Sequence, residues 1–291
     1  MAKFINPFTD IGFKRIFGQE VSKPILLTFL NSLLEGERKI IDLQYLDKEQ
    51  PGESETDKSL IYDVYCETDT GEKVIVEMQY KGQPYFKERS IYYLSRSISN
   101  QGIPGPEWNY SDVKAVYLVA LLNFKSRTIS EKFRTDVGLM DMQDYKLFSE
   151  KIRMIFLQLP YFTKEVEECE TIFEKIIYIL KHMDVLKRMP WLAQEAVFQR
   201  IASIADVASL SKQERIAYDE NLRKYRDTVA VMEGQWMEGH AEGRAEGRAE
   251  GRAEGRAEER KDNARKMKGK GYAIEDIAEI TGLTKEEIAQ L

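Results

Sequence analysis

Cysteine and histidine are scarce in this chain, with two of each among 291 residues. Cys66 and Cys169 lie far apart in apolar stretches, which predicts two buried thiols in a reducing compartment rather than a disulfide framework. His182 and His240 belong to no Cys/His cluster with zinc spacing and to no arrangement typical of a catalytic triad. These absences argue against a zinc site and against triad chemistry.

Long apolar segments and an excess of positive charge are also missing. No run of about 18 apolar residues occurs, which argues against a transmembrane helix. The first residues, MAKFINPFTD, lack the apolar core of a signal peptide. We therefore expect a cytoplasmic protein without a membrane partner. The net charge of −6 excludes a uniformly basic nucleic-acid binder, so any DNA contact needs a local basic patch.

What the sequence does contain is enough apolar residues, 43%, for a large core. The patterns divide the chain into four parts: a mixed core over 1–160, a helical extension over 161–236, a charged linker over 237–270 and a small helical hairpin over 271–291. Within the first part the order is helix, three strands, helix and strand. That order predicts a layered α/β structure with helices on both faces of a sheet.

The elements of the first part are located by their hydrophobic periodicity. Helices are predicted over 24–34 and 85–100. The polar stretch 49–59 predicts a loop. Strands are predicted at 40–46, 60–68, 73–80, 114–122 and 152–159.

The most informative pattern is the hairpin around the sequence DTG at 69–71. This sequence suits a three-residue turn with Gly71 in the left-handed conformation. The resulting register places Asp63 opposite Glu77. Because strand side chains alternate between faces, Gln79 shares the face of these two acids, while the other face is apolar and belongs to the core.

Two carboxylates directly opposite each other destabilise a sheet, and burial raises the cost unless a cation neutralises them. A divalent ion bound by oxygen atoms would resolve the conflict, and Mg²⁺ commonly binds through one or two carboxylates plus phosphate. The alternative is an exposed face that carries two solvated acids. A register slip of one residue would also separate the direct pair. The pattern alone leaves these alternatives open.

The same residues carry a resemblance to a known family. Asp63, followed after thirteen residues by Glu77-Met78-Gln79, resembles the PD-(D/E)XK nuclease signature with Gln in place of Lys. The segments FTDIGFKRIFG, IYDVYCETDTG and VIVEMQYKGQPYFKERSIYYLSR are similar to the bacterial Rpn family of recombination-promoting nucleases, also described as putative PD-(D/E)XK nuclease family transposases. The resemblance covers roughly residues 4–235.

The resemblance implies a PD-(D/E)XK, restriction-endonuclease-like core of the order α-β-β-β-α-β around a mixed sheet, and Mg²⁺-dependent cleavage of DNA, with Mn²⁺ as an alternative ion. Carried over, Asp63 and Glu77 would bind the metal together with the backbone carbonyl of Met78. Gln79 would orient water or contact the scissile phosphate, although a neutral amide supplies no positive charge to the transition state. Asp10 would complete the acidic cluster, or else it caps the helix that follows.

Three residues close to the predicted site are candidates for substrate binding: Arg89, Gln83 and Lys81. Arg89 would bind a phosphate as a bidentate donor, or it forms a surface salt bridge with Glu88. The function suggested is a DNA endonuclease of low sequence specificity, linked to recombination or mobile elements. A catalytically weak or inactive DNA-binding module with the nuclease fold, and a purely structural oligomer, are the alternatives.

The C-terminal part repeats AEGR four times from residue 241 and then has AEER. Each glycine costs about 1 kcal/mol against alanine in a helix, and equal charges four residues apart repel. We therefore predict a helix-prone linker ordered by a partner chain, and a homo-oligomer formed through the helical region or the tail. The basic segment 261–270 would hold DNA non-specifically. The hairpin at 271–291 resembles a helix-turn-helix, but Glu286 and Glu287 favour protein contact over DNA reading.

Overall fold

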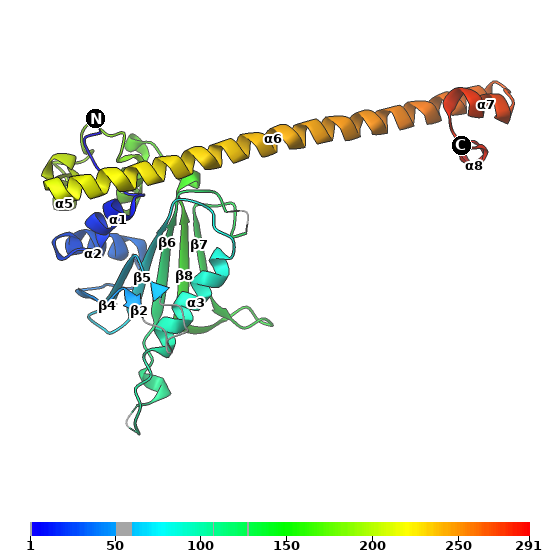
Figure 1. The fold of residues 1–291 in the computed structure, drawn as a ribbon. Helices are drawn as coiled ribbons and strands as arrows, with labels where there is room; N and C mark the ends of the chain where they lie inside the picture. The colour runs from blue at the N-terminus through cyan, green and yellow to red at the C-terminus, as the bar shows by residue number, and fades with distance from the viewer. Residues whose placement is uncertain (1, 51–59, 107, 127) are drawn as a thin grey trace. The chain divides into compact units, whose positions relative to one another are not determined.

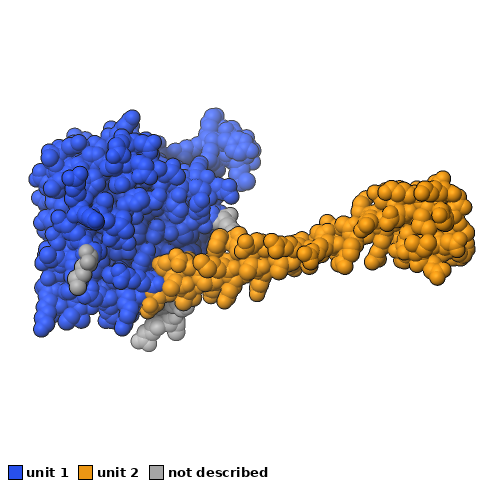
Figure 2. Space-filling view, turned by 90° about the horizontal axis from the view of Figure 1, so that it is seen from above, with its two compact units in different colours: residues 1–226 blue, residues 227–291 orange. Residues whose placement is uncertain are grey.

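The computed structural model describes residues 2–50, 60–106, 108–126 and 128–291. The contacts divide the chain into two compact units, residues 1–226 and residues 227–291 (Figure 2). From residue 51 onward, the loop predicted over 49–59 lies outside the described residues.

A six-stranded mixed sheet forms the centre of the first unit (Figure 1). In spatial order its strands are β1 (Leu43–Tyr45), β4 (Val64–Thr68), β5 (Lys73–Gln79), β6 (Val116–Leu122), β8 (Leu147–Gln158) and β7 (Arg134–Met140). Strands β5, β6 and β8 are parallel, and the other pairs are antiparallel. Two short strands, β2 (Glu49–Gln50) and β3 (Leu60–Ile61), form a separate pair. The predicted mixed sheet is confirmed.

Helices cover both faces of this sheet. One face packs against α1 (Asp10–Phe17), α2 (Lys23–Leu33), α4 (Ile172–His182) and α5 (Ala196–Ala205) in a single large core. The opposite face packs against α3 (Phe86–Ser99) in a smaller core that includes Tyr65 and Ile75. Both faces of the hairpin are therefore core, as the predicted helices on both faces of the sheet require, and the face that carries the acids, whose burial the sequence left open, is buried.

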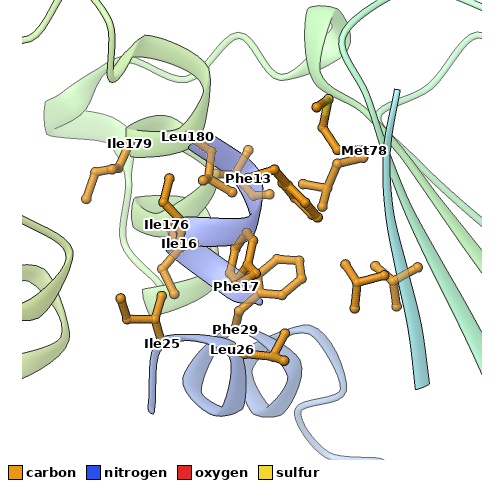
Figure 3. Packing of buried hydrophobic residues seen from close by; sticks show 14 of the residues in the cluster. Phe13, Ile16, Phe17, Ile25, Leu26, Phe29, Met78, Ile176, Ile179 and Leu180 are labelled. Carbon is orange, nitrogen blue, oxygen red and sulfur yellow. The ribbon is translucent and has the colours of Figure 1, made fainter. Parts of the chain in front are cut away.

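The first helix is fixed tightly at its start and along one side. Thr9 is the N-cap, since its hydroxyl accepts from the amide of Gly12 at 3.0 Å. A Cβ atom at Gly12 would lie 2.1 Å from the Asn6 carbonyl oxygen, so glycine permits this close approach. Further along, Phe13 and Phe17 point into the core among α2, α4 and Met78 of β5 (Figure 3). Helix α1 is thereby held against the strand that carries the candidate site.

One predicted strand is interrupted, and two strands, β2 and β7, were not predicted. The strand expected at 60–68 is interrupted at Tyr62 and Asp63, because the Tyr62 amide donates to the Lys48 carbonyl at 2.9 Å instead of continuing along β5. Strand β7 forms an edge hairpin with β8, with an irregular register near Leu139. Most of its side chains are partly or fully exposed, so its sequence lacks the apolar signal of a buried strand.

The helix α6 (Lys212–Gly269) contains the AEGR repeats, which were expected to form a linker. An isolated helix of this composition is marginal, but here the repeats continue an existing helix, so the costly nucleation step is already complete. A Cβ atom built at Gly243 or Gly247 would meet nothing within 4 Å, so no described side chain packs against the helix at these two glycines. Among the described residues, no helix is long and apolar enough to cross a membrane.

The end of the second unit is a small helical hairpin. Helices α7 (Ile274–Thr281) and α8 (Lys285–Gln290) pack on the end of α6. Gly282 has a φ of +68° between them, and Thr284 forms the expected capping box with Glu287. The small core of this hairpin is made of Ala264, Ile277 and Ile288.

Candidate active site

The two acids lie where β4 begins and β5 ends. Val64 pairs with Val76 in the antiparallel register, and the same register places Asp63 opposite Glu77. The turn has the predicted form, since Gly71 has a φ of +88°. The register inferred from the sequence DTG is therefore confirmed.

The acids are joined through the main chain of the hairpin. The amide of Asp63 donates to Glu77 Oε1 at 3.3 Å, and the amide of Met78 donates to Asp63 Oδ2 at 2.8 Å. Glu77 is 4% exposed, and Asp63 is half-buried. The alternative of two solvated acids on an exposed sheet face is excluded. Both carboxylates are instead held in fixed positions at the edge of a core.

Burial dominates the electrostatics of this pair. It raises the pKa of Glu77 to about 8, with the charge of Asp63 as the second cause. Burial also raises the pKa of Asp63, which the hydrogen bond from the Met78 amide partly offsets. Among the described residues no salt bridge joins either acid to a lysine or arginine. Two carboxylates in this state fit a divalent cation, which would neutralise both.

Gln79 and the main chain of Met78 extend the site along β5. The Gln79 amide donates to Glu77 Oε2 at 3.4 Å, and the residue is 9% exposed. The N–H group of Met78 points to Asp63, on the side away from β6. The N–H and C=O groups of one strand residue point the same way, so the Met78 carbonyl also points to the side of Asp63.

Of the three substrate-binding candidates, Arg89 and Gln83 lie together. The Arg89 guanidinium donates to Gln83 Oε1 and lies over the rings of Phe86 and Tyr93, at 5.3 and 5.6 Å from their centroids. Its charge acts on both acids, lowering the pKa of Glu77 and of Asp63 against the effect of burial. The structure shows no ion pair between Arg89 and Glu88 in the part of the chain that it describes.

Lys81 is half-buried and follows β5 by two residues. Over the described ranges it forms no ion pair with either acid. Its role in substrate binding stays a prediction that rests on its position in the sequence.

Asp10 lies near the pair, but it is held by a lysine. Its carboxylate accepts from Lys14 at 2.5 Å, and its charge raises the pKa of Asp63 after the larger effect of burial. Thr9 caps the helix, so the capping role considered for Asp10 was wrong. Within the described ranges, no group of three or more Asp, Glu, His or Cys side chains is arranged to hold a metal ion. A cation here would therefore have two carboxylates and other oxygen atoms as ligands.

Two lysines that the sequence interpretation did not single out also lie at the site. The charges of Lys14 and Lys48 both interact with that of Asp63. Lys14 stands four residues after Asp10, a spacing that predicts contact on a helix. Lys48 is brought near by its main-chain bond to Tyr62, and no sequence pattern signalled that pairing.

A family model described as PD-(D/E)XK nuclease family transposase matches residues 7–235. The chain belongs to this family. Searches for curated relatives and for similar solved structures found no match. Membership agrees with the mixed α/β sheet and with the resemblance of the hairpin, and it supports a nuclease-type hydrolase linked to mobile elements. Nucleases of this family act on DNA and generally use divalent metals, typically Mg²⁺.

Proposed function

We propose that the protein is a Mg²⁺-dependent DNA endonuclease of low sequence specificity that acts in recombination or mobile-element biology. The observation that carries the proposal is the buried Glu77 carboxylate, held opposite Asp63 without a salt-bridge partner in the described part of the chain. Such an arrangement is unfavourable for folding alone and favourable for binding a divalent ion. Mn²⁺ would serve as an alternative ion because it accepts the same oxygen ligands.

Each residue has a distinct task in this proposal. Asp63 and Glu77 hold the ion, with the Met78 carbonyl as a third ligand, and the Met78 amide fixes the Asp63 carboxylate. When bound, the ion supplies a Lewis acid for phosphodiester hydrolysis. Gln79, held against Glu77, orients the attacking water.

Arg89 binds a phosphate of the DNA backbone. Gln83 and the two rings beneath it restrict the Arg89 guanidinium, which lowers the entropy lost on binding. Lys81 adds positive charge beside β5. These contacts are to phosphates, which position DNA without reading its sequence, and low specificity follows from that.

Nicking of supercoiled plasmid in Mg²⁺ tests the proposal. Wild type is expected to nick the plasmid, Asp63→Ala is expected to lose at least 100-fold in rate, and EDTA is expected to abolish the reaction. Asp42→Ala is the matched control, because Asp42 is an acid paired with Lys23 and is expected to leave the rate unchanged. Equal rates for wild type and Asp63→Ala would refute the enzyme proposal.

A second candidate function is favoured by Gln79, whose neutral side chain stands where the signature has a lysine. It is a catalytically weak or inactive module that binds DNA with the nuclease fold. A gel shift in Ca²⁺ separates the two candidates. Binding in Ca²⁺ together with no nicking in Mg²⁺ or Mn²⁺ would favour the binding module.

A further inference from the structure

Lys14 projects from a helix that is fixed from several sides. The rings of Phe13 and Phe17 anchor α1 in the core (Figure 3). Arg15, the next residue, donates to the Ile204 carbonyl at 2.9 Å and to Glu214 at 2.6 Å. The Lys14 side chain is 29% exposed and bonds to Asp10 at 2.5 Å. Its ammonium group therefore has a defined position at the surface next to Asp63.

Lys48 reaches the same place from another part of the chain. The Tyr62 amide donates to the Lys48 carbonyl at 2.9 Å, so the main chain of Lys48 lies across from Tyr62 and beside Asp63. The Lys48 side chain is exposed. Helix α1 and the residue before β2 thus bring two cationic side chains close to the acid pair.

The two lysines are close enough to repel each other. Desolvation lowers the pKa of Lys48, and so do the direct side-chain contact with Lys14 and then its charge. Burial alone would lower the pKa of Lys14 too, but the Asp10 carboxylate outweighs it and the net pKa is raised. Like charges held side by side are unfavourable without an anion, just as the two acids are unfavourable without a cation.

The charges around the acid pair favour one class of anionic ligand. The charge of Asp63 attracts both lysines. A cation bound to the acids would satisfy that attraction, and Asp10 alone would then face Lys14 and Lys48. Excess positive charge beside a metal-binding pair suits a phosphate group, which offers several oxygen acceptors.

We propose that Lys14 and Lys48 form a phosphate-binding pair beside Asp63 and Glu77, with Asp10 as the positioning residue for Lys14. The pair supplies the positive charge that Gln79 does not carry. The catalytic part of this inference rests on the proposed nuclease function, whereas the binding of a DNA phosphate does not.

The experiment compares Lys14→Gln, Lys48→Gln and the double variant with Lys23→Gln. Lys23 is a matched control, since it pairs with Asp42 at 2.7 Å and its side chain is 26% exposed, close to that of Lys14. The first measurement is single-turnover nicking of plasmid in Mg²⁺. Each site variant is expected to lose roughly 100-fold, and the control nothing.

The second measurement needs no catalysis. Affinity for a fluorescein-labelled DNA duplex is measured in Ca²⁺ over a range of salt concentrations. Each site variant is expected to reduce the slope of log K against log salt by about 1, because one phosphate contact is lost. Lys14→Arg and Lys48→Arg keep the charge and are expected to keep the slope, so a folding defect is distinguished from a lost contact.

The salt dependence tests the phosphate-binding pair, and the nicking rate tests the proposed endonuclease. An unchanged slope in the double variant overturns the phosphate-binding pair, whatever the nicking rate. A reduced slope together with a wild type that never nicks DNA supports the pair and refutes the endonuclease.

Asp10 has its own test. Asp10→Asn keeps both positive charges and removes the ion pair that positions Lys14, so it is expected to lower kcat without weakening DNA binding. Asp10→Glu is expected to restore most of the rate, because it returns the negative charge to Lys14. Weaker binding by Asp10→Asn, or no rescue by Asp10→Glu, would overturn the positioning role.

Discussion

The first unit carries two groups of acids in opposite states. Asp63 and Glu77 have no salt bridge in the described chain, and burial raises the pKa of both. Glu37 and Asp136 both form ion pairs with Arg153. This ionic cluster lines a pocket of about 520 Å³. There, hydrogen bonds from arginine hold the pKa of both carboxyl groups below the usual range, for Asp136 against the opposing effect of burial.

The difference separates acids that stabilise the fold from acids that are available for chemistry. Arg153 donates to Asp136 Oδ1 at 2.6 Å and also to Glu37, so each carboxylate has its counter-charge within the chain. The hairpin acids have main-chain hydrogen bonds at 2.8 and 3.3 Å instead. Perturbed acids without a structural partner are candidates for function, whereas paired acids are explained by stability.

The largest expected effect comes from Glu77→Gln. This change removes a proposed metal ligand and is expected to lower nicking about 100-fold. It also removes an acid whose folded-state pKa is raised to about 8, so that at pH 7.5 the folded chain keeps a proton that the unfolded chain releases. The free energy of unfolding measured in EDTA at pH 7.5 is therefore expected to rise by roughly 1 kcal/mol or more. Denaturant melts and plasmid nicking of the same preparation check both parts. A lower free energy of unfolding for Glu77→Gln than for wild type in EDTA would contradict the difference drawn between the two groups of acids.

The next largest effect is stabilisation by the ion itself. A ligand at about 100 times its Kd stabilises the folded state by roughly 2.7 kcal/mol. Mg²⁺ or Mn²⁺ is therefore expected to raise the Tm of wild type and of Asp136→Asn, but not that of Asp63→Asn. Thermal melts with and without the ion provide the measurement. An equal shift in Asp63→Asn would place the ion elsewhere.

A smaller effect of opposite sign is expected from Asp136→Asn. The change from acid to amide is the same as at Glu77, but here it leaves Arg153 and Arg134 with less counter-charge. The cluster is partly exposed, so the loss of unfolding free energy is expected to be about 1 kcal/mol. Melts in EDTA compare the two variants directly. A gain in stability would show that the two groups of acids do not differ as described.

The position of Asp63 opposite Glu77 was predictable, because the local sequence of the turn determines it. The sequence DTG determines the turn, and the turn determines which residue faces Glu77. Lys48 was not predictable, because its place depends on a main-chain bond to Tyr62 that has no apolar pattern.

The edge strand β7 was missed for a related reason. An edge strand with mostly exposed side chains needs no alternation of apolar and polar residues. The long helix α6 was underestimated because helix propensity describes an isolated segment, whereas the AEGR tract continues a helix that begins in the folded unit. In each case the structure of the segment depends on residues outside it, either through a contact or through the helix that the segment continues.

The smallest expected effect is the pH dependence of the ionic cluster. The folded-state pKa of Glu37 and of Asp136 is lowered, so their stabilisation is present above the ordinary pKa of a carboxyl group. It is lost as the pH falls through the lowered folded-state pKa. The difference in unfolding free energy between wild type and Asp136→Asn is therefore expected to be full at pH 7 and to shrink toward zero near pH 2. Urea melts at these two pH values measure it, and a difference that grows on acidification would contradict the pairing with arginine.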